Sequence, residues 1–179
     1  MKQIIPFIHD LIKTSFNKSH IAIDATAGNG NDTLFLASHL KHVYAFDIQE
    51  AAIKATTKRL SDANQSNITL VHDSHEQIEK YVKTPYDVVM FNLGYLPKSD
   101  PSVITHKAST LNALRVALKG LNKGGLVCLT LYIGHAGGSE EADAVEAYVK
   151  TLESVHYQVL KYQFVNKEKA PYNIIIKKK

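Results

Sequence analysis

The residues with the clearest chemical meaning lie in and around a glycine-rich turn, Ala27-Gly-Asn-Gly-Asn31. An apolar run that ends in Asp24 precedes the turn, and a second apolar run further along the chain ends in Asp47. A strand, a glycine-rich turn that opens a helix, and an acid about 20 residues on are typical of a nucleoside-binding unit of the Rossmann type. We therefore expect the chain to bind an adenosine cofactor.

Two features favour S-adenosylmethionine (SAM) over a dinucleotide. The third glycine of G-x-G-x-x-G is absent, because Thr33 stands where it would be. Asp24 and Asp32 also flank the turn, and their negative charge would repel a pyrophosphate at a helix N-terminus but attract the ammonium and sulfonium groups of SAM. We expect Asp47 to accept hydrogen bonds from the two ribose hydroxyls, with Gln49 close by as a second polar contact.

Further polar clusters follow two later apolar runs, namely His72-Asp-Ser-His75 and Asn92-Leu-Gly-Tyr95. Ligands of open α/β sheets bind beyond the carboxyl ends of the strands, so these clusters should border the same cleft. We assign Asp73 or Ser74, with His75, to the adenine edge or the ribose. The side-chain oxygen of Asn92 can accept a hydrogen bond from an N–H of an amino group and so aim the lone pair of that nitrogen at a methyl group. Tyr95 can stack on a base.

The pattern along the chain alternates between strand and helix, which predicts an α/β fold with a mostly parallel sheet covered by helices on both faces. The last two strands have no room for a crossover helix between them, so we expect them to pair as an antiparallel hairpin. Lys123-Gly-Gly125 should make the tight turn into the fifth strand. The expected strands are 20–25, 42–47, 67–72, 86–92, 124–132, 155–164 and 172–177. The expected helices are about 3–17, 31–40, 49–61, 75–82, 105–120 and 139–151.

Composition limits the class of protein. The 179 residues are 45% hydrophobic, which is enough for one domain over 1–179 with a sizeable core. The one cysteine, Cys128, lies in an apolar run and reads as a buried thiol, so no disulfide framework or zinc cluster is expected and a cytoplasmic location fits. No stretch resembles a signal peptide or a membrane span. The net charge of +4 leans mildly toward a polyanionic partner.

The segments DATAGNGNDT, AFDIQ, HDSH, FNLGYLP and YIGHAGG together resemble the small bacterial family labelled putative rRNA methylases. That family belongs to the class I SAM-dependent methyltransferases, which have a seven-stranded, mostly parallel Rossmann-like sheet with one antiparallel strand. The resemblance covers nearly the whole chain. It implies SAM as the cofactor, no metal, and tRNA as the substrate. The reaction it implies is methylation of the amine of 5-aminomethyl-2-thiouridine at the wobble position, in the anticodon region, to 5-methylaminomethyl-2-thiouridine.

The resemblance and the motifs together name two sets of residues. The set expected to bind the cofactor is Asp24, Ala27, Gly28, Asn29, Gly30, Asn31, Asp32, Thr33, Asp47, Ile48, Gln49, Asp73, Ser74 and His75. The set expected near the reacting amine is Asn92, Gly94 and Tyr95, with His9, His135 and the Gly137-Gly138 turn at the rim.

An alkylamine must lose a proton before it can attack a methyl group. At a lysine-like pKa, about one molecule in 2,500 is neutral at pH 7, so the site should lower the pKa of the amine or hold a base. His9, His75 and His135 are the candidate bases. An aromatic amine of a base in rRNA would need none.

Other functions stay open at this point. They are methylation of an adenine or guanine amine in rRNA, methylation of a protein glutamine or a small-molecule amine, an NAD-dependent oxidoreductase, and an RNA-binding module without catalysis. We expect no separate RNA-binding domain, so the catalytic domain or a homodimer would hold the RNA. Lysines and an arginine near the loop after the fourth strand could contact phosphates, namely Lys98, Lys107, Arg115 and Lys119.

Overall fold

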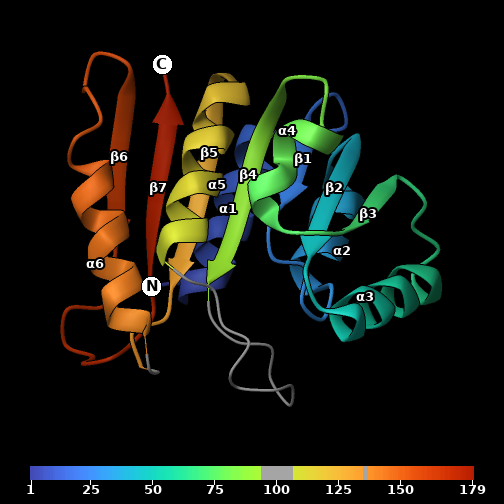
Figure 1. The fold of residues 1–179 in the computed structure, drawn as a ribbon, viewed down its shortest axis with the longest axis horizontal. Coiled ribbons are helices and arrows are strands. Elements are labelled where there is room, and N and C mark those ends of the chain that lie inside the picture. The colour runs from blue at the N-terminus through green and yellow to red at the C-terminus, as the bar shows by residue number, and fades with distance from the viewer. Residues whose placement is uncertain (94–106, 135–136) are drawn as a thin grey trace.

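A seven-stranded sheet with helices on both faces forms the body of the molecule (Figure 1). The computed structural model describes residues 1–93, 107–134 and 137–179. The strand order is β3-β2-β1-β4-β5-β7-β6, and only β7 runs antiparallel to its neighbours. This order confirms the predicted fold class and the predicted hairpin of the last two strands. The strands are β1 Ile21–Asp24, β2 His42–Asp47, β3 Ile68–His72, β4 Tyr86–Leu93, β5 Leu121–Leu131, β6 Tyr157–Tyr162 and β7 Tyr172–Lys178.

The helices fall close to their predicted places. One difference is the predicted helix 75–82, which is a 3₁₀ turn capped by the Ser74 hydroxyl, followed by a short α-helix. The helices are α1 Ile4–Ser15, α2 Asn31–His39, α3 Glu50–Asp62, the 3₁₀ turn η1 His75–Gln77, α4 Ile78–Tyr81, α5 Lys107–Gly120 and α6 Gly138–Val149.

The two faces of the sheet bury two separate apolar clusters, as β4 makes clear. Val88 and Met90 point toward α1 and α2 and pack with Ile8 and Leu36. The alternate residues of β4, such as Phe91, point toward α4, α5 and α6 on the opposite face (Figure 1). Which face a side chain of β4 occupies therefore decides which helices it can contact.

One turn was placed wrongly. Lys123-Gly-Gly125 was predicted to precede the fifth strand, but β5 already begins at Leu121, which pairs with Tyr86. The pairing then shifts so that Val88 lies beside Leu126, and Gly124 has a φ of 82° within this irregularity. The glycines therefore form a bulge inside β5 rather than a turn before it.

Cys128 is fully buried in β5, as predicted, and burial raises the pKa of its thiol to about 12. Among the described residues, no helix combines the length and apolar character that crossing a bilayer requires. The same part of the chain holds no cluster of three or more His, Cys, Asp or Glu side chains suited to a metal ion.

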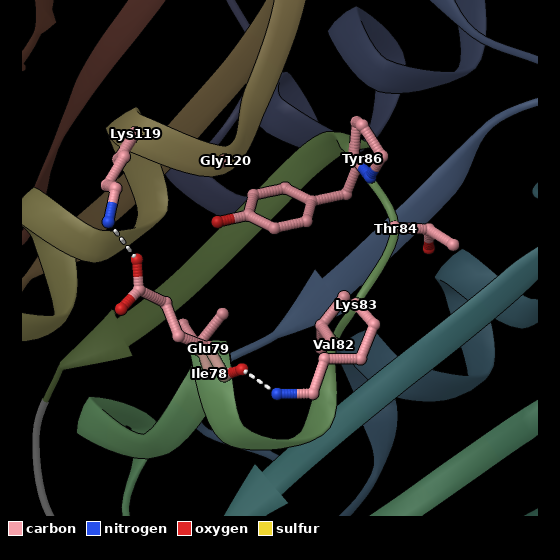
Figure 2. Close-up of a pocket in the computed structure, with 9 residues that line it drawn as sticks. Ile78, Glu79, Val82, Lys83, Thr84, Tyr86, Lys119 and Gly120 are labelled. Carbon is pink, nitrogen blue, oxygen red and sulfur yellow. Dashed lines mark hydrogen bonds and ion pairs between the residues drawn. The ribbon is translucent and has the colours of Figure 1, made fainter.

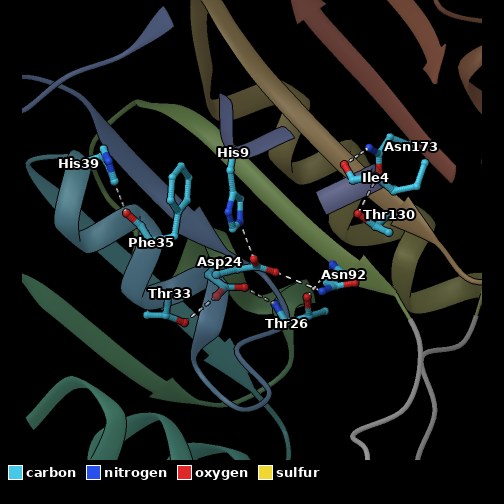
Figure 3. Close-up of polar contacts among 11 residues, drawn as sticks. Ile4, His9, Asp24, Thr26, Thr33, Phe35, His39, Asn92, Thr130 and Asn173 are labelled. Carbon is cyan, nitrogen blue, oxygen red and sulfur yellow. Dashed lines mark hydrogen bonds and ion pairs between the residues drawn. The ribbon is translucent and has the colours of Figure 1, made fainter. Parts of the chain in front are cut away.

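A buried asparagine ties the first helix to the sheet. Asn173 on β7 donates from Nδ2 to the Ile4 carbonyl over 2.8 Å, and its Oδ1 accepts from the Thr130 hydroxyl over 3.0 Å (Figure 3). Asn173 and Thr130 are both buried, so water is poorly placed to replace these bonds. The N-terminal end of α1 is thereby fixed against β5 and β7.

Asn173→Ala should lower the free energy of unfolding by about 1–3 kcal/mol, because it leaves the Thr130 hydroxyl buried without its partner and removes the bond to the Ile4 carbonyl. Urea unfolding followed by circular dichroism would measure the change. Asn166→Ala, at an exposed turn position, is the matched control and should stay within about 0.5 kcal/mol of the parent protein. Equal losses in the two variants would contradict the role of Asn173.

Candidate functional site

The glycine-rich turn bends sharply between β1 and α2. Gly28 and Gly30 have positive φ values of 54° and 75°, which glycine adopts without strain. Thr56 of α3 packs directly over Gly30, where a Cβ would lie only 3.0 Å from the Thr56 Cα, and the Thr56 hydroxyl donates to the Gly28 carbonyl over 3.2 Å. The turn therefore needs glycine at position 30 for close packing as well as for its backbone angle.

Asp47 is oriented toward this turn by the backbone. Its Oδ2 accepts from the Gly28 N–H and its Oδ1 accepts from the Gln49 N–H, each over 2.9 Å. A carboxylate oxygen has room for a second hydrogen bond. The side chain is thus held in place and can still accept from two further hydroxyl groups.

Asp24 is almost completely buried at the end of β1. Its Oδ2 accepts from the Thr33 hydroxyl over 2.6 Å, and its Oδ1 accepts from the Thr26 N–H over 3.1 Å. Burial, with the negative charge of nearby Asp32 adding to it, raises the pKa of the Asp24 carboxyl to about 7, and the two hydrogen bonds only partly oppose this rise. A cation bound beside Asp24 would favour its ionised form.

A chain of polar contacts links three elements at this edge of the sheet. His9 Nε2, from α1, lies 2.8 Å from Asp32 Oδ1 on the first turn of α2. Asn92 Nδ2, near the end of β4, donates to Asp32 Oδ2 over 3.1 Å. Figure 3 shows His9, Asp24 and Asn92 converging beside the glycine-rich turn. Residues far apart in the sequence therefore meet at this edge of the sheet.

The other end of the Asn92 amide is open. Its Oδ1 is buried and has no hydrogen-bond partner among the described residues. The backbone N–H of Asn92 donates to Thr26 Oγ1 over 2.7 Å, which fixes the end of β4 against the turn after β1. A buried acceptor without a partner costs about 1–3 kcal/mol unless a ligand supplies a donor. The site therefore presents an acceptor to an incoming N–H or O–H group.

Tyr132 directly follows β5 and lies near Asp32 and Asn92. Burial raises the pKa of its phenol, the charge of Asp32 adds to the effect, and the neighbouring Asn92 side chain opposes it. The phenol therefore stays protonated near neutral pH and is not a base there. Its position agrees with the expectation that the segment after the fifth strand borders the cleft.

The cluster after β3 is held by its own contacts. Asp73 Oδ2 accepts from the Tyr81 hydroxyl over 2.8 Å and from Lys80 Nζ over 3.2 Å, and these bonds keep the pKa of Asp73 low. Ser74 Oγ accepts from the Glu76 N–H and caps η1.

His75 is buried, its Nδ1 lies 3.1 Å from the Ala25 carbonyl, and its ring meets the edge of Phe91. Phe91 and Asn92 point to opposite faces of the sheet, so His75 does not lie on the side of the Asn92 amide. Burial also lowers the pKa of His75. Of the two candidate bases that the structure describes, only His9 belongs to the chain of contacts that includes Asn92.

The other predicted residues are placed as follows. Ala27 donates its N–H to the Phe46 carbonyl, and the Asn29 carbonyl accepts from Arg59 Nε over 2.6 Å. Asn31 begins α2, and Ile48 is 57% exposed beside Asp47. Four predicted residues lie outside the described residues, namely Gly94, Tyr95, Lys98 and His135.

Sequence reasoning missed Thr26, Thr56 and Arg59. Thr26 lies within the glycine-rich motif and could have been flagged there as a short polar side chain at the end of a strand. Thr56 and Arg59 contact the turn from α3, and the sequence pattern around these two residues does not predict that contact.

One predicted RNA contact is placed elsewhere. Lys119 lies in the last turn of α5 and pairs with Glu79 over 2.7 Å. Because α5 starts at Lys107, Lys119 lies about 18 Å along the helix axis from the beginning of α5. Arg115 lies over the ring of Tyr148.

A hollow of about 510 Å³ lies between α4 and the end of α5 (Figure 2). Tyr86 lines it, and Tyr86 begins β4, whereas Asn92 lies six residues further along the strand. That separation is about 20 Å. The hollow is therefore at the opposite edge of the sheet from the glycine-rich turn and is no part of this site.

Comparisons with known proteins agree with the geometry. The family described as Putative rRNA methylase matches residues 43–178. The chloroplastic tRNA (mnm(5)s(2)U34)-methyltransferase of Arabidopsis thaliana is 38% identical over an alignment of 184 positions, which covers 95% of this chain and 67% of that protein.

Two solved structures share the fold along nearly their whole length. A protein from Streptococcus mutans, described as a putative methyltransferase and crystallised with S-adenosylhomocysteine (SAH), is 43% identical with a TM-score of 0.95, covering 100% of this chain and 99% of that one. An rRNA methylase from Streptococcus thermophilus is 35% identical with a TM-score of 0.87, covering 99% and 98%.

The raised pKa of Asp24 predicts an unusual dependence of stability on pH. Because the folded pKa of about 7 exceeds the ordinary value of 3.8, the folded protein holds this proton more tightly than the unfolded chain. The contribution of Asp24 to stability should therefore fall as pH rises from about 4 to 7, by on the order of 4 kcal/mol in total. Asp24→Asn removes the titration.

Urea unfolding of cofactor-stripped protein at several pH values between 4.5 and 7.5 would measure the contribution of Asp24 to stability. The stability of the parent protein relative to Asp24→Asn should decline across that range, whereas its stability relative to Asp62→Asn, on the exposed end of α3, should not. A constant difference between the parent and Asp24→Asn would show that Asp24 titrates normally.

Proposed function

The chain belongs to the Putative rRNA methylase family of SAM-dependent methyltransferases, and we propose that it methylates the amine of 5-aminomethyl-2-thiouridine at the wobble position of tRNA. The product is 5-methylaminomethyl-2-thiouridine. The observation that carries this proposal is the buried, unpartnered Oδ1 of Asn92 beside the glycine-rich turn. The name of the Arabidopsis relative supports the choice of substrate.

The donor set at the ends of β1 and β2 fits SAM. The carboxylates of Asp24 and Asp47 suit a ligand that carries an ammonium, a sulfonium and a pair of ribose hydroxyls. In this proposal Asp47 accepts from the hydroxyls, Asp24 lies toward the ammonium, and exposed Ile48 covers one face of the adenine. Ser74 and the neighbouring residues after β3 border the adenine edge.

When bound, SAM supplies a methyl group on a positively charged sulfur, and the sulfur keeps the bonding electron pair when the methyl group leaves. Asn92 Oδ1 accepts an N–H of the neutral amine and orients its lone pair along the line of attack. The new C–N bond leaves the nitrogen as a protonated secondary amine. One further proton, lost when the substrate ammonium became neutral, must reach solvent.

A second candidate is an amine on a base of rRNA, which the description of the family and of the Streptococcus thermophilus structure favours. Such an amine is conjugated and already neutral. It would therefore use the same acceptor, Asn92, without any need to lose a proton before attack.

The cofactor assignment predicts that Asp47→Ala weakens SAH binding by about 100-fold, because two hydroxyls lose a charged acceptor and Gly28 loses a backbone partner. Isothermal titration calorimetry would measure the Kd. Asp62→Ala, an exposed acid on α3, is the control and should bind SAH like the parent protein. Unchanged affinity in Asp47→Ala would remove Asp47 from the pocket.

The substrate assignment is tested with tRNA from a strain that lacks the gene. Purified protein and SAM should convert accumulated 5-aminomethyl-2-thiouridine to its methylated form, as read by nucleoside mass spectrometry. Asn92→Ala should slow this conversion by about 100-fold while SAH binding is retained. If tRNA is unchanged and rRNA gains the methyl group, the second candidate is correct.

A further inference from the structure

The contacts of Asn92 determine which end of its amide faces the substrate. An asparagine amide has an oxygen and a nitrogen of similar size, so shape alone does not select between two orientations related by a half-turn. Hydrogen-bond partners make the selection. An ionised carboxylate only accepts, so Asp32 requires the Nδ2 end of Asn92 to face it, and Oδ1 must face the other way.

The orientation matters for the chemistry. With Oδ1 toward the substrate, the amide accepts an N–H of the amine and leaves the nitrogen lone pair available. With Nδ2 toward the substrate, the amide would donate to that lone pair and occupy the electrons needed for attack. Only one of the two orientations is therefore productive for an amine nucleophile.

His9 holds Asp32 in the required position. Its Nε2 contacts Oδ1 of Asp32, so Oδ2 is the oxygen directed at Asn92. The His9 ring stacks on Phe35 with centroids 3.8 Å apart and planes 5° from parallel, which restricts its rotation (Figure 3). The Phe35 ring thus supports the His9 ring, and His9 in turn contacts the Asp32 carboxylate.

We propose that His9 and Asp32 are positioning residues that lock the Asn92 amide with its oxygen toward the reacting amine. This inference rests on the proposed function, because it concerns an amine nucleophile. His9 faces Asp32 rather than the open Oδ1 of Asn92, so it acts through Asp32 and does not itself contact the reacting atoms.

Exchanging the two side chains tests the proposal directly. In Asp32→Asn, residue 32 can donate to Asn92 Oδ1 and turn the amide around, so kcat on the aminomethyl-uridine tRNA should fall by about 100-fold. In Asn92→Asp, two carboxylates face each other, and kcat should fall by a similar factor. In the double variant Asp32→Asn/Asn92→Asp, an amide donates to a carboxylate whose two ends are both acceptors.

At alkaline pH, where the amine is neutral despite the new carboxylate at residue 92, the double variant should therefore recover kcat to within about tenfold of the parent protein, a strongly non-additive result. It also keeps the net charge of the parent, so long-range effects on SAM are nearly matched. A double variant no faster than the slower single variant would overturn the proposal.

His9 variants separate positioning from folding. His9→Gln keeps an N–H donor for Asp32 and should retain kcat within about tenfold, whereas His9→Phe keeps the stacking on Phe35 but loses the donor and should lose about 100-fold. KM for tRNA and the Kd for SAH should stay unchanged in both. Equal kcat losses in the two variants, or a loss confined to KM, would remove His9 from this role.

An NMR measurement on the protein without RNA makes the inference independent of the substrate. The Asn92 side-chain NH₂ signals, assigned by their absence in Asn92→Asp, should change strongly in Asp32→Asn because a bond to a carboxylate is lost. Unchanged signals would overturn the proposed orientation. A parent protein that fails to methylate the tRNA but shows this NMR change would refute the proposed substrate and leave the orientation standing.

Discussion

The parallel pairing of β1 with β4 is the contact on which the site depends. At this pair the chain order reverses, since β1 leads outward through β2 to β3 while β4 leads the other way through β5. The loops that leave the two strands therefore diverge and open a crevice. The register places Asp24 beside Met90. Two residues further along each segment, Thr26 lies beside Asn92, and the Asn92 N–H donates to Thr26 Oγ1, which holds the ends of the two segments together.

The crevice concentrates negative charge before any cofactor is considered. Asp24, Asp32 and Asp47 come from three different elements, and the charges of Asp32 and Asp47 both raise the pKa of Asp24. Each of the three carboxylates accepts hydrogen bonds from the protein, which offsets part of the cost of burial. A ligand with two positive charges would offset more of it, so the same arrangement that is costly in the empty protein favours SAM when it binds.

The features that could be predicted from the sequence are those that local pattern controls. Apolar runs located every strand, and polar residues at the ends of those runs located Asp24, Asp47 and Asn92, because parallel strands bring their carboxyl ends to one edge. Lys123-Gly-Gly125 was predicted as a turn before β5 because glycines indicate a change of chain direction. They do not indicate whether the residues before them, here Leu121 and Asn122, already belong to the strand. The contact of Thr56 with the glycine-rich turn and the position of Lys119 beside Glu79 depend on how the helices pack, which local pattern does not show. The orientation of the Asn92 amide depends on Asp32, sixty residues away in the sequence.

Asn173 has a consequence for the order in which the protein can be assembled. Synthesis proceeds from the N-terminus, so α1 leaves the ribosome long before the residue that anchors it, 169 positions further along the chain. The same late segment, β7, inserts between β5 and β6, and β6 has no other neighbour in the sheet. A nascent chain that has not yet released Tyr172–Lys178 therefore lacks the bond that fixes the start of α1 and has an unpaired edge strand.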